Sequence, residues 1–284
     1  MSTMAILQDV DKCMRCNGCV VSCKRTWKMK ALNPGIHKTA PDQRVIIKSQ
    51  KRVDMGPFMR YTCWHCTNPP CTKRCPFAAI NKMPNGAVAI DPAKCTPGGT
   101  NANGVVCTYQ CQVDCGRGGY PKVGAGSDLY ADDEPKAWKC TLCYGRAGIG
   151  ESLIASYGTP LPTKATTAEV TAVPEKAHQP SCVYTCPAKA MNWDTKTNIL
   201  AYINSASNGF ISAQGDGSMY WASRKFLLIA PKADPFVEDH VSPLMSSLVS
   251  GPFAKAALVP TLLAGGLVAV IARRQRIADE VGEV

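Results

Sequence analysis

Acidic side chains are scarce in the first part of this sequence. Residues 1–82 contain 15 Lys and Arg but only 4 Asp and Glu, whereas residues 83–284 contain 17 of each kind. The net charge of +11 is therefore carried by the N-terminal part of the chain. The sequence also lacks the low hydrophobicity of a disordered chain, because 45% of its residues are hydrophobic and 19% are charged. Disorder is excluded as its main character.

Histidine is scarce as well. The four histidines stand apart from one another at His37, His65, His178 and His240. Isolated histidines are ordinary surface or packing residues more often than metal ligands. His65 is the most interesting of them, because it lies between Cys63 and Cys66. We expect it to form a hydrogen bond near whatever these cysteines hold.

Cysteine, by contrast, is abundant, with 16 residues in four sets of four. The first set is spaced C-x2-C-x2-C-x3-C, as in bacterial-type [4Fe-4S] ferredoxins, where the fourth thiolate ligates a neighbouring cluster. The second set is spaced C-x2-C-x4-C-x3-C and is followed by proline. These two sets are Cys13, Cys16, Cys19 and Cys23, and Cys63, Cys66, Cys71 and Cys75.

The other two sets depart from this regular spacing. The third is spaced C-x11-C-x3-C-x3-C, and the fourth consists of a C-x2-C pair, a 38-residue insertion and a C-x3-C-P motif. These sets are Cys95, Cys107, Cys111 and Cys115, and Cys140, Cys143, Cys182 and Cys186. Each set still supplies four thiols, so four [4Fe-4S] clusters would use every cysteine.

Two of the sets continue in the same way. Cys75 and Cys186 each begin a C-P-x-x-A segment that is followed by an apolar residue. Proline fixes φ after the last cysteine of a cluster loop, so we interpret the segment as a turn before a short apolar element that packs over a neighbouring cluster. The shared segment indicates a repeated structural unit.

Two other uses of cysteine are disfavoured. A structural zinc site uses two C-x2-C pairs that are well separated in sequence, and it has no use for three cysteines within seven residues. Disulfides are disfavoured because Cys13, Cys16 and Cys19 are too close in sequence to bridge one another without strain. Iron–sulfur clusters account for all the thiols with none left over.

Anionic clusters also explain the basic N-terminal part. A [4Fe-4S]2+ core with four thiolates carries a charge of −2, so four of them would bring the net charge of +11 to about +3. We expect part of the flanking basic residues to favour reduced clusters and part to be solvated surface. Nucleic-acid binding, which a basic segment can also indicate, is disfavoured. The flanking residues are Lys12, Arg15, Lys24, Arg25, Lys73 and Arg74.

The fold class that follows is α+β. We predict tandem bacterial-type 2[4Fe-4S] ferredoxin units followed by a single C-terminal transmembrane helix. Strands are expected at 44–50, 58–61 and 87–90, and the last of these follows a turn at Asn85 and Gly86. The elements are short because clusters replace much of the apolar core.

The chain divides into a four-cluster domain, residues 1–196, and a C-terminal extension, residues 197–251, that leads to the membrane. The domain contains an insertion, 144–181, which is rich in proline, threonine and alanine. Such a composition predicts an extended loop on the surface.

The sequence near the C-terminus predicts a membrane span. Residues 256–272 carry no charge and are followed by three arginines. They would rise about 26 Å as a helix, the short end of what a bilayer needs, and Lys255 can extend the span by snorkelling. We predict a transmembrane helix over 252–273 and a tail, 274–284, that the positive-inside rule places in the cytoplasm. The arginines are Arg273, Arg274 and Arg276.

This orientation would put the cluster-bearing head on the periplasmic side of the inner membrane. No signal peptide or twin-arginine motif precedes Cys13. We therefore expect the head to cross the membrane in folded form, together with a partner that carries the export signal.

The order of the four sets resembles that of the four-cluster iron–sulfur, or beta, subunits of membrane-bound molybdopterin oxidoreductases. The C-x2-C-x4-C-x3-C-P second set and the split fourth set carry this resemblance, and the single C-terminal span is most similar to beta subunits of the formate dehydrogenase-N type. The resemblance implies a nested pairing, first set with fourth and second with third. Site 1 would comprise Cys13, Cys16, Cys19 and Cys186; site 2, Cys140, Cys143, Cys182 and Cys23; site 3, Cys63, Cys66, Cys71 and Cys115; and site 4, Cys95, Cys107, Cys111 and Cys75.

The resemblance further implies an electron-transfer subunit without a catalytic centre. Electrons would pass between a molybdenum- or tungsten-pterin catalytic subunit and a membrane cytochrome b or quinone-reactive subunit in anaerobic respiration. Two alternatives are a stand-alone membrane-tethered ferredoxin or redox sensor, and the anchored iron–sulfur subunit of a hydrogenase or another oxidoreductase complex. Co-purification of a large molybdopterin protein would distinguish an obligate subunit from a stand-alone one.

Overall fold

The computed structural model describes residues 2–29, 44–50, 56–115, 121–124, 135–144 and 163–230. All of them belong to one compact unit, Met1–Phe236. Within these ranges no helix has the length and apolar character needed to cross a bilayer. The predicted transmembrane helix, 252–273, and the predicted tail, 274–284, lie outside the described residues.

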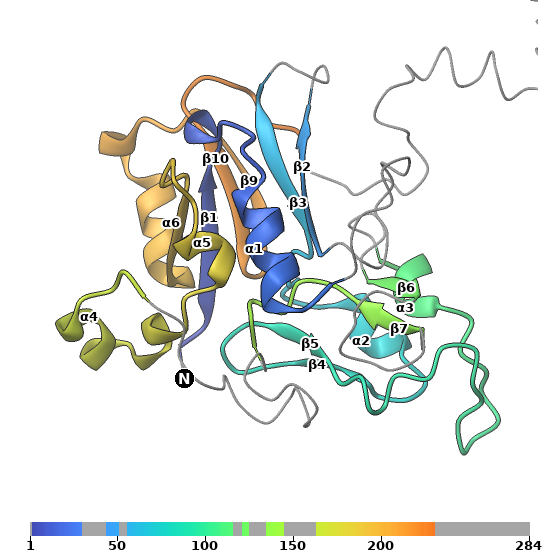
Figure 1. Ribbon diagram of the computed structural model, residues 1–284. Helices are drawn as coiled ribbons and strands as arrows, with labels where there is room; N and C mark the ends of the chain where they lie inside the picture. Colours follow the sequence, from blue (N-terminus) through green and yellow to red (C-terminus); the bar gives the residue numbers. More distant parts are fainter. Residues whose placement is uncertain are drawn as a thin grey trace, which may run out of the picture. The chain divides into compact units, whose positions relative to one another are not determined.

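A four-stranded sheet joins the N-terminal segment to the end of the described chain (Figure 1). Its strands run in the order β8-β1-β10-β9, and β1 pairs in parallel with β10 while the other neighbours are antiparallel. The strands are β1 (Met4–Asp9), β8 (Met191–Thr195), β9 (Ser212–Asp216) and β10 (Met219–Ser223). Much of the predicted C-terminal extension is thus part of the same fold as the cysteine segments.

The two central strands are buried on both faces. Successive side chains of a strand point to opposite faces, so Met4 and Ile6 of β1 join one hydrophobic cluster while Ala5 and Leu7 join another. The second cluster is covered by helix α6 (Lys196–Asn204), which contacts β1 and β8. The first cluster contains cysteines of several sets. The sheet therefore separates an apolar helical side from a cysteine-bearing side.

Helices α1 (Gly18–Thr26) and α5 (Ser181–Tyr184) contact each other on the cysteine-bearing side (Figure 1). Helix α1 follows a short 3-10 helix, η1 (Val10–Lys12), and a second one, η4 (Ala206–Asn208), follows α6. The contact between α1 and α5 brings the first cysteine set beside the end of the fourth.

Three hairpins complete the cysteine-bearing side. They are β2 (Val45–Ser49) with β3 (Phe58–Thr62), β4 (Ile80–Lys82) with β5 (Val88–Ile90), and β6 (Lys122–Gly124) with β7 (Lys136–Trp138). The strands predicted at 44–50, 58–61 and 87–90 are confirmed as β2, β3 and β5. Helix α2 (Pro70–Arg74) contacts α3 (Gln110–Val113), so the second and third cysteine sets also meet.

The prediction of an extended loop is wrong for the described end of the insertion. Residues 163–181 contain helix α4 (Thr167–Ala172) and the 3-10 helix η3 (Pro174–His178). Thr166 and Glu169 form a capping box, in which each side chain accepts a hydrogen bond from the other residue's backbone N–H. This cap satisfies backbone donors at the start of α4, and it offsets the low helix propensity of the surrounding threonines.

Candidate metal centres

The four cysteines predicted for site 1 line one cavity, together with Gln8 and Arg60. The cysteines come from the loop after η1, from the start of α1 and from the turn after α5. Gly18 lies at the seam, because a Cβ atom built there would be 3.6 Å from Cys16 Sγ and 4.0 Å from Pro187 Cδ. The fold thus brings Cys186 to the first set across more than 160 residues of sequence.

The four cysteines predicted for site 3 line a second cavity. Cys63, Cys66 and Cys71 come from the loop between β3 and α2, and Cys115 follows α3. The cavity wall also contains Thr62, Trp64 and Val88.

The thiols of sites 2 and 4 come together as well. Cys23 interacts electrostatically with Cys140, Cys143 and Cys182, which are the other three residues of site 2. Cys111 interacts in the same way with the other three residues of site 4. Those three residues are Cys75, Cys95 and Cys107. The structure therefore brings together each group of four, while their role as cluster ligands stays a prediction.

Neighbouring sites are linked in a series. Cys182 of site 2 interacts with Cys19 of site 1, and Cys63 of site 3 interacts with Cys140 of site 2. Cys111 of site 4 interacts with Cys71 of site 3. These links give the spatial order 1, 2, 3, 4.

The loops around the cysteines have a repeated backbone geometry. The second residue after Cys13, Cys63, Cys107 and Cys140 has positive φ in each case. The C-P-x-x-A turns repeat too, because Ala78 and Lys189 have positive φ and the next N–H donates to the sulfur of Cys75 or Cys186 at 3.3 and 3.4 Å. Both turns lead into a strand, β4 or β8. The predicted repeat is confirmed at this level.

Backbone donors point at other sulfurs too. The N–H groups of His65, Ala137 and Leu142 lie 3.3, 3.3 and 3.4 Å from the sulfurs of Cys63, Cys95 and Cys140. Hydrogen bonds of this kind stabilise negative charge on sulfur. The loops are therefore arranged to hold thiolates, which are the form of cysteine that binds metal.

The spacing of the sulfurs fits a polynuclear cluster. All sixteen cysteines are free thiols. Among the described residues, no three His, Cys, Asp or Glu side chains converge closely enough to bind a single metal ion. A lone zinc ion would need sulfurs about 2.3 Å from one point. Four thiols around a cavity instead suit a larger body, such as an iron–sulfur cluster.

Burial dominates the acidity of most of these thiols. It raises the pKa of Cys19 and of Cys95 to about 11, and that of Cys71 and of Cys111 to about 12. Removal of a thiol from water disfavours its charged form. These cysteines are therefore neutral at pH 7 in the metal-free chain, and metal binding must displace their protons.

Cys140 is the exception. Burial alone would raise the pKa of this thiol, but Arg60, the backbone N–H of Leu142 and the Lys139 ammonium together lower it below the ordinary value. Cys140 is thus the thiol most prepared to lose its proton.

Buried cations near the thiols are functional residues that the sequence interpretation missed. Arg60 and Lys139 are 0% and 1% exposed, and Arg44 and Lys136 are also buried. Lys139 Nζ donates to the carbonyls of Val88 and Cys140, and Lys136 Nζ donates to the carbonyl of Cys95 at 3.0 Å. Their charges lie beside the thiols although none of them flanks the first two cysteine sets in sequence.

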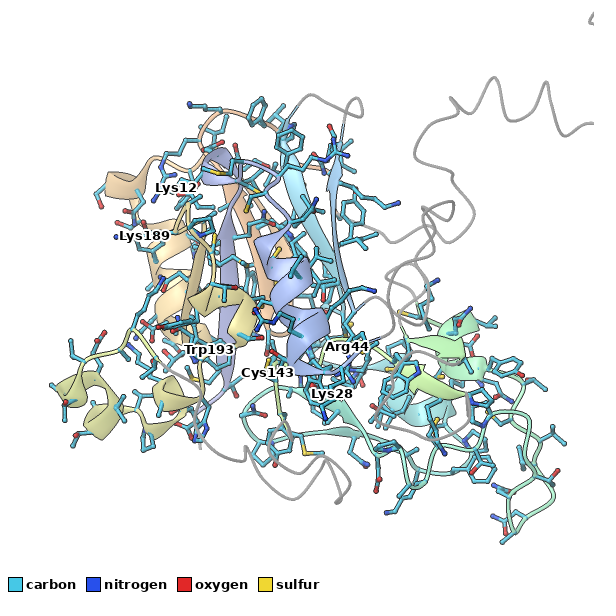
Figure 2. The ribbon with its side chains drawn as sticks, in the orientation of Figure 1. Lys12, Lys28, Arg44, Cys143, Lys189 and Trp193 are labelled. Carbon is cyan, nitrogen blue, oxygen red and sulfur yellow. The ribbon has the colours of Figure 1, made fainter. Side chains whose placement is uncertain are left out.

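Arg44 is held by aromatic stacking. Its guanidinium carbon lies 4.0 Å from the ring centre of Trp27, the residue at the end of α1, and the cation also interacts with Cys23. Arg44 and Cys143 both lie near this end of α1 (Figure 2).

The predicted flanking cations are mostly on the surface. Lys12, Arg25, Lys73 and Arg74 are exposed, and Arg15 and Lys24 are partly buried. Lys12 and Arg74 form exposed ion pairs with Asp9 and Asp114. For these two residues the solvated-surface alternative is the better description.

The histidines add no described metal ligand. His65 is buried, and its Nδ1 accepts a hydrogen bond from the N–H of Val88 at 2.9 Å, so the ring proton is on Nε2. Burial, followed by the charge of Lys139, lowers the pKa of His65 well below the usual range. The predicted hydrogen bond of His65 close to the cysteines is therefore found. His178 lies in η3, and His37 and His240 are outside the described residues.

No known protein-family profile matches the chain. Individual relatives do. An electron-transfer relative from Allochromatium vinosum, the second subunit of its sulfite dehydrogenase, is 28% identical over 202 residues, which cover 67% of this chain and 68% of that protein. The formate dehydrogenase-O iron-sulfur subunit of Escherichia coli is 24% identical over 208 residues, 69% of this chain and 54% of that protein.

A shorter match is the thiosulfate reductase electron transfer subunit of Salmonella typhi. It is 29% identical over 90 residues, 32% of this chain and 45% of that protein. The chain thus spans about half the length of several relatives and about two thirds of the sulfite dehydrogenase protein.

Proposed function

We propose that this chain, a relative of the iron–sulfur subunits of molybdopterin oxidoreductases, is the electron-transfer subunit of such a complex and holds four [4Fe-4S] clusters. One observation carries the proposal: sixteen free thiols form four groups of four, and neighbouring groups interact in a series. A structural role for the thiols would not require that series.

When bound, [4Fe-4S] clusters supply one-electron chemistry. The chain's own residues hold, charge and insulate them. Thiolates bind each cluster, backbone N–H groups stabilise sulfur charge, and Arg60 and Lys139 add positive charge. All five tryptophans are buried in the hydrophobic cluster that contains Cys19, Cys23, Cys140 and Cys182. Such surroundings exclude water from the sites and lower the local dielectric.

Bond chemistry in this proposal belongs to a separate catalytic subunit. The relatives named for sulfite, formate and thiosulfate match at similar identities of 28, 24 and 29%. We therefore propose the class of the partner, a molybdopterin protein, and not its substrate. Co-purification tests this part: the tagged chain should bring down a large molybdopterin-containing protein, and a chain that purifies alone would favour a stand-alone ferredoxin.

Metal analysis tests the clusters themselves. Protein purified without oxygen should contain about sixteen iron and sixteen acid-labile sulfide per chain. Eight iron per chain, or stoichiometric zinc, would rule out the proposed set of four clusters.

The nested pairing has its own test. Cys186→Ser should alter the EPR signal of the cluster held by Cys13, Cys16 and Cys19, because Cys186 shares their cavity. Cys182→Ser is the matched change in the same segment and should alter a different signal. A Cys186→Ser effect confined to the cluster of Cys140, Cys143 and Cys182 would contradict the pairing.

We also propose that residues 252–273 anchor the chain in the inner membrane beside a cytochrome b or quinone-reactive subunit, with the head periplasmic. The uncharged run 256–272 and the arginines after it support this proposal. Removing 252–284 should release a head that keeps its iron, since no cysteine lies beyond Cys186, while electron delivery to the membrane falls sharply.

Protease added outside the inner membrane tests the orientation. It should reach the head and spare a tag placed after Val284. A protected head with an exposed tag would invert the topology without affecting the electron-transfer role.

A further inference from the structure

Arg60 of β3 is a fully buried cation whose backbone is clamped from two sides. Its N–H donates to Gln8 Oε1 of β1 at 2.7 Å, and its carbonyl accepts a hydrogen bond from Trp221 Nε1 of β10 at 3.0 Å. The two central strands of the sheet therefore fix where this arginine begins.

The guanidinium lies between two of the sites. Its Nη2 is 3.5 Å from Cys182 Sγ and 3.8 Å from Cys140 Sγ, both of site 2. The same side chain lines the cavity formed by the four cysteines of site 1. Its Nη1 is 3.2 Å from Met219 Sδ, a neutral neighbour. One cation is thus shared by two neighbouring thiol groups.

No carboxylate of the described residues forms an ion pair with Arg60. A buried charge without a counter-charge costs several kcal/mol. The groups around the guanidinium that can become negative are thiols, with those of Cys182, Cys140 and Cys19 interacting most strongly. The counter-charge that this site requires is therefore metal-bound thiolate.

We propose that Arg60 is a potential-setting residue shared by sites 1 and 2. This inference rests on the proposed function. Addition of one electron makes a cluster more negative, so a fixed cation nearby stabilises the reduced form and raises the reduction potential. Arg60 itself gains and loses neither electrons nor protons. Its burial leaves this charge unscreened by water and salt.

The test compares Arg60→Met with Arg25→Met in the full chain with its partners, purified without oxygen. Arg25 lies on α1, two residues from Cys23, but it is exposed, so its charge is screened by solvent. Each protein is titrated electrochemically while the EPR signals of its clusters are followed. Signals are assigned to sites 1 and 2 through the Cys186→Ser and Cys182→Ser variants.

In Arg60→Met we expect the ratio of reduced to oxidised cluster at a fixed potential to fall at least tenfold for sites 1 and 2. That is a downward shift of 59 mV for a one-electron couple. Sites 3 and 4, and all four sites in Arg25→Met, should keep their potentials. Unchanged potentials in Arg60→Met, or an equal shift in all four sites, would overturn the inference.

A second pair of variants leaves Arg60 in place. Met219→Glu puts a carboxylate beside Nη1 and cancels the charge, and Met219→Gln is its neutral control. Met219→Glu should lower the same two potentials and Met219→Gln should not. Loss of iron in both Arg60→Met and Met219→Glu would assign Arg60 a structural role and overturn the proposal. Iron and sulfide content of the unsubstituted protein tests the proposed function separately.

Discussion

At the scale of single residues, protonation of the thiols links the fold to pH. Cys19, Cys71 and Cys111 have pKa values of about 11, 12 and 12 because of burial, whereas an unfolded thiol titrates near 8.5. Between these values the folded metal-free chain binds more protons than the unfolded chain. Its stability therefore falls as the pH rises through this window.

This gives a prediction for the metal-free protein. Its urea midpoint, measured without oxygen and with reductant after chelation of the metal, should fall between pH 8 and pH 10. The slope is at most about 1.4 kcal/mol per buried thiol and pH unit. The metal-loaded protein, whose thiolates carry no proton in either condition, serves as the control. A midpoint that rises over this range would contradict the buried, neutral thiols.

Lys139 supplies a second prediction at this scale. Its ammonium donates to the buried carbonyls of Val88 and Cys140 and lies near thiols of sites 2 and 3. Lys139→Met should leave those carbonyls without a donor and lower the free energy of unfolding by about 1–3 kcal/mol. Denaturation of the metal-loaded protein measures the loss.

The control for this substitution is Lys73→Met, which removes an exposed lysine near the second cysteine set. It should change stability by less than about 0.5 kcal/mol. Equal effects of the two substitutions would show that the buried hydrogen bonds of Lys139 are not what matters.

Residue spacing identifies the cysteines but not the cations between them. All sixteen thiols could be grouped from sequence because their ligand spacing is local. Arg60 could not be found, since its contacts with Cys140, Cys182 and Met219 span 80 to 159 residues. Nothing in the strand sequence around Arg60 distinguishes it from a solvated arginine.

At the scale of elements, local signals predict some segments and fail for others. Strands β2, β3 and β5 were predictable from apolar residues next to a turn or a break. Helix α4 was not predicted, although Thr166 and Glu169 have the spacing of a capping box, because prolines and threonines nearby indicated a loop. The parallel pairing of β1 with β10 joins residues more than 200 apart, and no local pattern encodes it.

The capping box of α4 can be tested directly. Helix α4 buries none of its residues, so its cap is a large part of what stabilises it. Thr166→Ala should cost about 1 kcal/mol and speed amide hydrogen exchange in residues 167–172. Thr171→Ala, which removes only a hydroxyl bonded to the carbonyl of Thr167, is the control and should leave exchange nearly unchanged. Equal exchange in both variants would contradict the cap. Iron content should be unaffected in either variant.

At the scale of the whole molecule, the sheet makes the C-terminal part of the described chain a support for the sites. Met219 and Trp221 of β10 are fully buried on the cysteine-bearing side, beside Met4 and Ile6 of β1. Arg60 is positioned by Trp221. The sites therefore depend on a strand that lies after the last cysteine.

Two truncations test this dependence. A chain that ends at Phe236 keeps the compact unit and should retain the iron of the full-length chain. A chain that ends at Asn204 loses β9 and β10, exposes one edge of β1 and should lose iron from sites 1 and 2. Metal analysis of both chains, purified in parallel, is the measurement. Equal iron in the two would show that the sheet does not support the sites.

The mixed origin of the thiols sets a timetable for biosynthesis. The thiols of sites 3 and 4 are all synthesised once Cys115 has been added, whereas site 1 waits for Cys186. At ribosomal speeds of about 5–20 residues per second, these 71 further residues take roughly 4 to 14 s. During that interval the cysteines nearest the N-terminus have been made but lack their last partner. The iron–sulfur assembly machinery therefore meets a nascent chain whose inner sites can be filled first, and oxygen damage in that interval would fall on the outer ones.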